Sequence, residues 1–333
     1  MIMLTANCFI YAAGPGTSAA NFLKLGIGAR AIGMGESFTA VADDVNALYW
    51  NPAGLGFLKS KEITASHNVW FQDIKYDFIG FAIPVSGKSS GGDIFVDGKR
   101  VPAVQGIPGV IGISATYLYM EGIERRSGNT ADPDGYFGAS DMSLSLSYAQ
   151  QVLKFSNDSM VTSGINLKVI SQQIDDKKAR AYAVDLGVIS RLNQWSFGFV
   201  VQNIGSQIKF IEKSYPLPLT YKFGAAYYLL NRSLSISLDL NKPIDNKINF
   251  NLGSEYWVGG MFALRAGYLR KDSMSREALV GKGLGSMNDG GLASLTGMMA
   301  GAGFRIFNYG VDYAFVPYGD LGATHRFTMN MKF

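Results

Sequence analysis

Apolar and polar residues alternate with a period of two along most of this 333-residue chain. The last nine residues follow the pattern strictly: Phe327, Met329, Met331 and Phe333 alternate with polar residues. Successive side chains of a β-strand point to opposite faces, so the pattern predicts a strand with one apolar and one polar face. A strand at the end of a soluble sheet and a strand in a membrane barrel both fit this pattern, and the rest of the chain decides between them.

The alternation recurs in about fourteen segments, each close to the roughly 9–11 residues that a tilted transmembrane strand needs. Bacterial barrels have an even number of strands, as found here. We therefore predict an all-β fold with a single closed antiparallel barrel over residues 59–333. The predicted strands lie near residues 61–71, 75–84, 109–122, 138–152, 159–174, 180–192, 195–204, 219–229, 233–241, 247–257, 261–271, 295–307, 309–316 and 322–333.

The connections between the predicted strands differ in length on the two sides of the barrel. Those after the even-numbered strands are mostly tight, whereas those over residues 127–138, 205–218 and 272–294 are long. Outer-membrane barrels have short periplasmic turns and longer outer loops, so both chain ends are predicted to be periplasmic. Residues 86–108 are a long exception on the periplasmic side, with the turn signal Asp97-Gly98, and are predicted to be an insertion.

Composition supports strands as the membrane-spanning units. Charged residues make up 17% of the chain, compared with roughly 25% in soluble domains. No run approaches the roughly 18 uninterrupted apolar residues of a transmembrane helix. The net charge of +4 comes from scattered Lys and Arg residues, which gives no support for nucleic-acid binding. The single cysteine, Cys8, excludes an intramolecular disulfide and a cysteine metal cluster.

The N-terminal residues resemble a secretory signal peptide. Residues 2–13 are apolar and lead into Ala12-Ala13-Gly14, a small-residue stretch of the kind that precedes cleavage. The basic residues that usually come first are missing, which favours a translation start upstream of Met1. We expect residues 1–20 to be this signal.

The predicted lumen-facing positions carry charges of both signs on neighbouring strands. Lumens of such barrels are normally polar, so the first interpretation is a set of ion pairs in a wet lumen, and the second is substrate binding. These lumen charges are Asp185, Lys222, Asp239, Glu255, Arg265, Arg305, Asp312 and Arg326.

Residues 24–58 do not alternate and are rich in small residues. Asp43 or Asp44 is predicted to cap a short helix, and Asn51-Pro52 to end it, because the residue before a proline avoids the helical region. We predict that residues 21–58 form a compact hatch inside the bore, since a wide barrel needs something to fill it.

Several motifs resemble those of PorV/PorQ-like proteins, a branch of the FadL-type outer-membrane barrels. At the N-terminal end they are residues 28–35, residues 42–44 and Tyr49-Trp50-Asn51-Pro52-Ala53-Gly54-Leu55. The others are Gln202-Asn203-Ile204-Gly205 and the closing stretch over residues 312–326. The resemblance implies a fourteen-strand barrel in the bacterial outer membrane, with a hatch in the bore.

The resemblance also implies two possible roles. FadL-type relatives pass hydrophobic small molecules across the outer membrane, and PorV-like relatives serve type IX secretion by engaging exported proteins or the translocon. In the first role, which we favour, the gate would comprise Asp43, Asp44, Asn51, Pro52, Ala53 and Gly54. The expected partners are outer-membrane lipid, the barrel-insertion machinery, and either a hydrophobic small molecule or secretion partner proteins.

We expect neither an enzyme nor a cofactor. Residues 26–31 match part of a dinucleotide fingerprint and residues 82–89 part of a phosphate loop, but neither has the required strand and helix around it. His67 and His325 are far apart in sequence and have no carboxylate or cysteine at ligand spacing, so neither a metal site nor a catalytic pair is predicted.

The terminal aromatic residue generates the first testable prediction. Phe327, Met329, Met331 and Phe333 would form an assembly signal that the barrel-insertion machinery reads. Deleting Phe333 is expected to lower the amount of folded barrel in the outer membrane, as measured by membrane fractionation and heat-modifiable migration on gels. Normal insertion of the truncated chain would refute this role.

Overall fold

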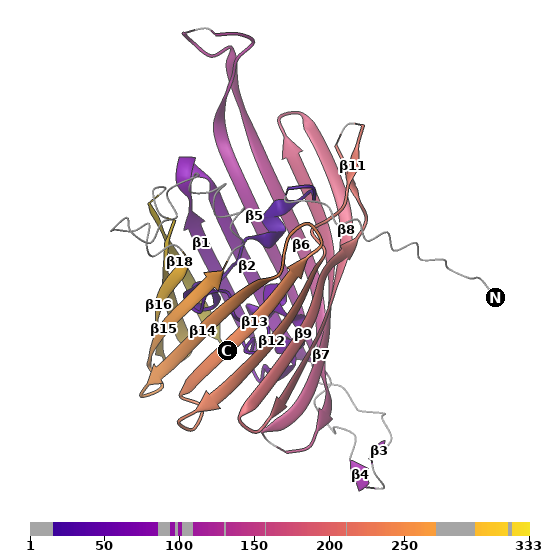
Figure 1. Ribbon diagram of the computed structural model, residues 1–333, viewed down its shortest axis with the longest axis vertical. Helices are drawn as coiled ribbons and strands as arrows, with labels where there is room; N and C mark the ends of the chain where they lie inside the picture. Colours follow the sequence, from indigo (N-terminus) through magenta and orange to yellow (C-terminus); the bar gives the residue numbers. More distant parts are fainter. Residues whose placement is uncertain are drawn as a thin grey trace, which may run out of the picture.

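Fourteen antiparallel strands close into one barrel (Figure 1). The computed structural model describes residues 16–85, 94–96, 99–101, 109–129, 131–156, 158–210, 212–270, 297–318 and 322–333. Around the barrel the strands follow chain order, and the last strand pairs with the first. The all-β closed barrel predicted from the alternation is thus confirmed, and each predicted segment overlaps one barrel strand.

The barrel strands are β1 (Glu62–Val69), β2 (Lys75–Val85), β5 (Gly109–Arg125), β6 (Gly135–Lys154), β7 (Ser159–Ile174), β8 (Lys177–Leu192), β9 (Trp195–Gly205), β12 (Thr220–Leu229), β13 (Leu234–Pro243), β14 (Asn249–Val258), β15 (Phe262–Arg270), β16 (Met298–Ile306), β17 (Tyr309–Pro317) and β18 (Ala323–Lys332). Two short hairpins stand outside the barrel sheet: β3 (Ile94–Val96) with β4 (Lys99–Val101), and β10 (Ile208–Lys209) with β11 (Ser214–Tyr215). The first hairpin belongs to the predicted insertion, most of which lies outside the described residues. The predicted signal peptide lies largely outside them too.

The barrel closes through the pairing of β1 with β18. Their register runs from Glu62 opposite Lys332 to Asn68 opposite Arg326. Beyond the strand ends, Lys61 and Phe333 exchange two backbone hydrogen bonds of 3.1 and 3.0 Å. Closure leaves the barrel sheet without an open edge, which is a requirement for a sheet in lipid.

Apolar side chains cover the outer face of the barrel. In β18 the outward Phe327 and Met329 are 54% and 66% exposed, whereas the inward Arg326 and Thr328 are buried. Phe333, also predicted to face lipid, is 50% exposed. A face of this kind is stable against hydrocarbon and costly against water, so the barrel wall is suited to a membrane.

The two ends of the barrel differ. We call the end at which β1 begins and β18 ends the periplasmic end, because short turns such as Asn193-Gln194 lie there. The opposite end is the outer end. The neighbouring strands β5 to β8 contain 16 to 20 residues each, compared with 8 to 11 in the other barrel strands. One side of the wall therefore rises above the outer mouth (Figure 1).

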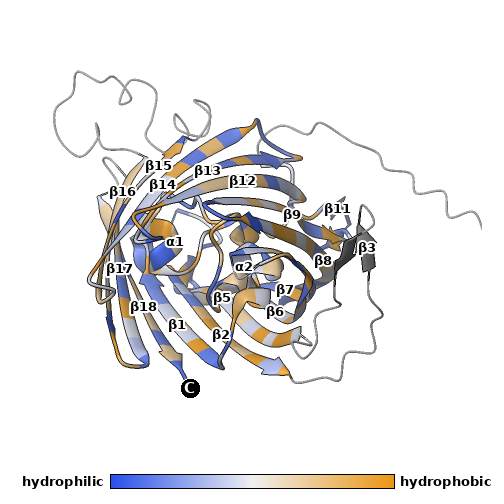
Figure 2. Cartoon of the chain, turned by 90° about the horizontal axis from the view of Figure 1, so that it is seen from below, coloured by the Kyte–Doolittle hydropathy of each residue, from blue (hydrophilic) through white to orange (hydrophobic). Residues whose placement is uncertain are grey.

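Residues 18–58, which we call the inner segment, run through the bore from the outer end to the start of β1. Viewed along the barrel, the helices α1 and α2 lie inside the ring of strands (Figure 2). The segment contains η1 (Asn21–Lys24), α1 (Ala29–Gly33), α2 (Ala47–Trp50) and η2 (Pro52–Phe57), while the short η3 (Phe71–Asp73) follows β1. No helix in the described part of the chain is long and apolar enough to span a membrane.

The local predictions for α2 are partly right. The helix ends at Trp50, and Asn51 before Pro52 is extended at φ −158°, as predicted. The predicted cap is wrong: Asn46 is the N-cap residue, and no side chain caps the helix. Asp44 instead accepts hydrogen bonds from the backbone and the side chain of Asn46, because the residues before the helix turn toward a buried arginine described below.

Glycines in the wall let the inner segment approach the strands closely. Gly253 and Gly267 face each other across β14 and β15. A Cβ on Gly267 would lie 2.0 Å from the backbone nitrogen of Gly35, and one on Gly253 would lie 2.4 Å from Met34 O. Similar pairs occur at Gly164 with Gly187 and at Gly198 with Gly224. The backbone of the inner segment thus packs directly on the backbone of the wall.

This packing predicts the effect of adding one methyl group. Gly267→Ala is expected to displace the inner segment and to destabilise the barrel by about 1–3 kcal/mol, the usual cost of overpacking. The temperature at which the folded gel band disappears should fall, and protease should cleave the inner segment more readily. Gly128→Ala is the matched control, because nothing lies within 4 Å of a Cβ at that position. Equal stability of the two variants would contradict the close packing.

Candidate functional site

A buried arginine fixes the inner segment in the periplasmic half of the lumen. Arg30, on α1, is 6% exposed. Its Nε and Nη2 donate to the two carboxylate oxygens of Glu255 at 2.8 and 2.7 Å. Its Nη1 donates to Asp43 at 2.7 Å and to Asp44 at 2.8 Å. Arg30 therefore joins two parts of the inner segment to strand β14.

The same network continues into the wall. Arg265 on β15 contacts Glu255 at 2.7 Å and Asp312 on β17 at 2.8 Å. On the opposite side of the lumen, Arg191 on β8 contacts Asp43 at 3.2 Å. We call Arg30, Asp43, Asp44, Arg191, Glu255, Arg265 and Asp312 the charge cluster. It connects four strands through the inner segment in the periplasmic half of the lumen.

All eight predicted lumen charges point inward, but several of them hold the inner segment rather than a neighbouring strand. Asp239 accepts hydrogen bonds from the backbone N–H groups of Phe38 and Thr39 at 3.0 and 2.8 Å. Arg326 donates to Gly26 O at 3.0 Å. Lys222 lies over the ring of Trp50 at 4.9 Å.

The remaining lumen charges contact wall residues. Asp185 pairs with Lys168 at 2.7 Å, and Arg305 lies 4.1 Å over the ring of Trp257. Arg265 joins two other predicted charges, Glu255 and Asp312, in ion pairs between strands. The partner of Asp185 is Lys168, which is not among the predicted charges.

The predicted gate residues lie in tight contacts. Asn51 donates to Thr39 O at 3.0 Å and accepts from the backbone N–H of Ala53 at 3.2 Å. Pro52 packs on Gly164, and Gly54 on Ala42 O. Asp43 and Asp44 belong to the charge cluster. The structure brings these residues together as contacts that hold the inner segment, and their role in gating stays a prediction.

The Gln202-Asn203 motif ties β9 to the inner segment. Gln202 donates to Tyr49 O at 2.7 Å and to Trp50 O at 3.1 Å, where α2 ends. Asn203 has a positive φ of 63° and lies where the register of β8 and β9 shifts. Its backbone N–H donates to Asp185 at 2.8 Å. The motif thus combines a bulge in the wall with a partner for the end of a helix.

Apolar residues line part of the outer half of the lumen, between polar ones such as Asn68, Gln202 and Arg326. Lumen-facing apolar residues there are Tyr76, Phe78, Ile170, Ala179, Ala181, Ala183, Leu269, Met299, Ala314 and Val316. Phe22 and Leu23 of the inner segment are buried in the same apolar cluster. We call this region the outer chamber.

Hydrogen bonds fasten the inner segment over the outer chamber. The hydroxyl of Tyr49 lies 2.7 Å from Leu25 O, and that of Tyr76 lies 2.9 Å from the same oxygen. Ser18 donates to Asp245 at 2.5 Å. Asp245, in the loop after β13, also pairs with Lys24. Burial alone would raise the pKa of Asp245, but the hydrogen bonds from Lys24 and Ser18 hold it below its ordinary value.

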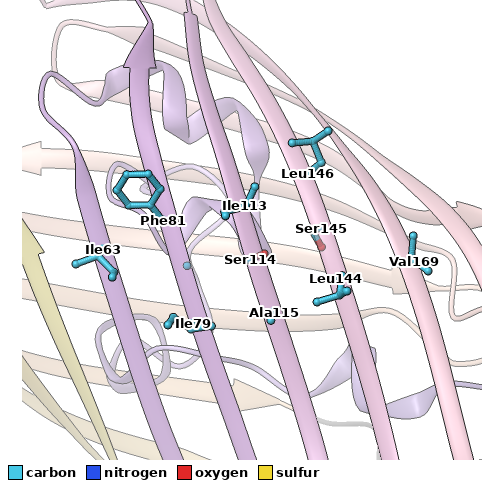
Figure 3. A pocket seen from close by; sticks show the side chains of 11 residues that line it. Ile63, Ile79, Phe81, Ile113, Ser114, Ala115, Leu144, Ser145, Leu146 and Val169 are labelled. Atoms are coloured by element: carbon cyan, nitrogen blue, oxygen red, sulfur yellow. The ribbon is translucent and has the colours of Figure 1, made fainter.

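A hollow of about 420 Å³ lies outside the barrel, on the face that contacts lipid (Figure 3). It forms where the small Ala115 lies among outward Ile79, Ile113 and Leu144. On the lumen side, Leu48 of the inner segment packs on Gly80 and Gly112. The β2–β5 ladder is unbroken across this region, so the hollow does not open into the lumen.

Sequence reasoning did not identify three residues of the lumen contacts, namely Arg30, Lys168 and Arg191. Arg30 is the only charge between Gly26 and Gly35, a run otherwise of small and apolar residues. Lys168 and Arg191 occupy inward positions of predicted strands. Their charge in the alternation was a usable signal for the two strand residues, whereas the partners of Arg30 come from distant parts of the chain. Among the described residues, no group of three His, Cys, Asp or Glu side chains could hold a metal ion.

Comparisons with known proteins agree with this architecture. A model of an uncharacterised protein family, UPF0164, matches residues 12–91. No curated protein matches the chain. The chain resembles the solved structure of the toluene transporter TbuX of Ralstonia pickettii, with 12% identity, coverage of 92% of this chain and 98% of that chain, and a TM-score of 0.54.

Two further solved structures are similar. The CymD monoaromatic hydrocarbon channel has 11% identity, coverage of 92% and 96%, and a TM-score of 0.55. A FadL homologue of Pseudomonas aeruginosa has 10% identity, coverage of 92% and 97%, and a TM-score of 0.51. At such identities the likeness establishes the fold, which is that of FadL-type outer-membrane barrels. Together with the apolar outer face, this fold places the protein in the bacterial outer membrane, whereas the narrower PorV/PorQ resemblance stays a prediction.

The charge cluster generates a prediction about closure. Arg30→Met leaves Glu255, Asp43 and Asp44 without their shared cation, and breaking a buried ion pair in this way costs about 3–5 kcal/mol. We expect the inner segment to loosen and ion conductance in planar bilayers to rise. Adding Asp44→Asn should restore part of the closure, because Arg30 is the only cation that pairs with Asp44 among the described residues.

Arg125→Met is the control for this prediction, since it breaks an exposed ion pair with Asp175. Exposed pairs contribute only about 0–1 kcal/mol. Conductance as low in Arg30→Met as in the control would show that the charge cluster does not keep the barrel closed.

Proposed function

We propose that the barrel binds hydrophobic small molecules at its outer end and passes them across the outer membrane. The observation that carries this proposal is the set of apolar lumen-facing residues in the outer chamber, because a wet pore has no need of them. Phe22 and Leu23 now cover these apolar surfaces. Two of the similar solved structures are described as a toluene transporter and a monoaromatic hydrocarbon channel, which supports a ligand of this class.

Passage requires the inner segment to move. The charge cluster closes the way to the periplasm, and the β2–β5 wall has an unbroken ladder from Lys75 opposite Tyr119 to Val85 opposite Gly109. A ligand in the outer chamber therefore proceeds to the lumen or the bilayer only after contacts of the inner segment are broken. In this proposal residues 43–54 act as the gate.

Ligand binding provides the direct test. Ala181 is fully buried and faces the outer chamber. Ala181→Asn places an amide without designed partners on an apolar surface, at a cost of about 1–3 kcal/mol, so binding of toluene or a long-chain fatty acid should weaken roughly tenfold or more. Ser171→Asn is the matched control, because Ser171 lies on the outward face of the neighbouring strand β7.

Titration of the purified protein in detergent and uptake by reconstituted vesicles would both be measured. If the unmodified protein binds neither class of ligand and promotes no uptake, the proposal is lost. Equal weakening in both variants would place the ligand outside the outer chamber.

A secretion-accessory role is the second candidate. The filled bore favours it, since a barrel that acts by holding exported proteins or a translocon needs no open path. Pull-down in mild detergent distinguishes the two roles. Recovery of a larger translocon or of exported proteins supports the second role, and a solitary barrel that binds hydrocarbons supports the first.

A further inference from the structure

The outward face of β8 changes character toward the outer end. Val188, Leu186 and Val184 form its apolar part. Above them lies Tyr182, which is 63% exposed. Arg180 follows, and then Lys178, both exposed. An aromatic residue above an apolar stretch marks the membrane interface, so the two basic side chains lie beyond the hydrocarbon.

The height of these side chains can be estimated from strand geometry. A strand rises about 3.3 Å per residue, and barrel strands tilt by roughly 35–45°. Two residues therefore add about 5 Å along the membrane normal. The polar layer on each side of a bilayer is roughly 5–7 Å thick. Arg180 then lies within the headgroup layer above Tyr182, and the backbone of Lys178, about 10 Å above Tyr182, lies just beyond it, so that its long flexible side chain can reach back into the layer.

No acidic partner among the described residues neutralises these two charges. Arg180 lies opposite Ser171, and Lys178 lies opposite Gln173. The two aspartates of the β7–β8 turn have other partners: Asp175 contacts Arg125 at 2.5 Å, and Asp176 contacts Lys177 at 2.9 Å. The two cations are thus available to an external anion at headgroup height.

We propose that Arg180 and Lys178 bind the phosphate groups of an anionic glycolipid in the outer leaflet. The planar guanidinium of Arg180 can donate two parallel hydrogen bonds to a phosphate, and Lys178 adds a second positive charge one outward step above it. Ser171 and Gln173 can supply neutral hydrogen bonds from the adjacent strand. The extra length of β7 and β8 is what raises this face into the headgroup layer (Figure 1).

The test compares two double variants in nanodiscs. Arg180→Gln with Lys178→Gln removes both cations from the outer end. Lys59→Gln with Lys154→Gln is the control, because it removes two exposed lysines near the periplasmic end. The bound lipid would be quantified by native mass spectrometry and by titration, with a phosphorylated glycolipid and with its dephosphorylated form.

Each basic residue near an anionic surface contributes roughly fivefold to binding, so the outer variant should bind the phosphorylated lipid about 30-fold more weakly. The control should bind as the unmodified protein does, and salt should reduce the difference. Folded gel migration and hydrocarbon binding should stay unchanged in both variants, which separates this proposal from the function proposed above. Unchanged lipid binding by the outer variant, equal weakening in the control, or equal affinity for the dephosphorylated lipid would overturn it.

Discussion

In hydrocarbon, every backbone N–H and C=O group needs a partner within the protein, and a sheet meets this demand only by closing on itself. The pairing of β18 with β1 is therefore the constraint on which the other features depend. Closing fourteen strands produces a bore that side chains of the wall alone do not fill. The inner segment fills it, and its small residues match glycines in the wall, so that backbone meets backbone where larger side chains would not fit.

The lumen charges follow from the same constraint. Because the apolar side chains of the wall face lipid, its polar side chains point into the lumen. There they pack against the inner segment and are shielded from water. A buried charge without a partner is far more costly than a paired one, so each burial requires a matching ion or hydrogen bond. Arg30 illustrates this requirement, because it faces three carboxylates, one of which also contacts Arg265. These paired charges lie beside buried apolar residues of the inner segment, such as Ile32 and Phe38, so both kinds of contact fill the periplasmic half.

The sequence predicts the barrel well because strand alternation is a local property. Each segment carries its own two-residue period, and β18 shows it most clearly, with the outward Met329 next to the buried Thr328. The inner segment has no such repeat. Asp44 looks like a helix cap in the sequence because its partner Arg30 is 14 residues away and meets it only after the chain turns. Likewise, the apolar outer chamber combines single residues from many strands, such as Ile170 and Met299, and no local window contains them.

The two halves of the lumen hold the inner segment by different means, which sets the order in which its contacts can break. Near the outer chamber, Tyr49 and Tyr76 hold it through neutral hydrogen bonds to a backbone carbonyl, together with the single ion pair of Lys24 with Asp245. Such bonds contribute about 0.5–1.5 kcal/mol each. At the periplasmic end, breaking the Arg30 pairs costs about 3–5 kcal/mol. The outer part of the segment is therefore the less strongly held, and an apolar molecule arriving from outside would meet that part first. In the proposed function, contacts over the outer chamber would open while the charge cluster stays intact, and the barrel would admit a ligand without becoming an open pore.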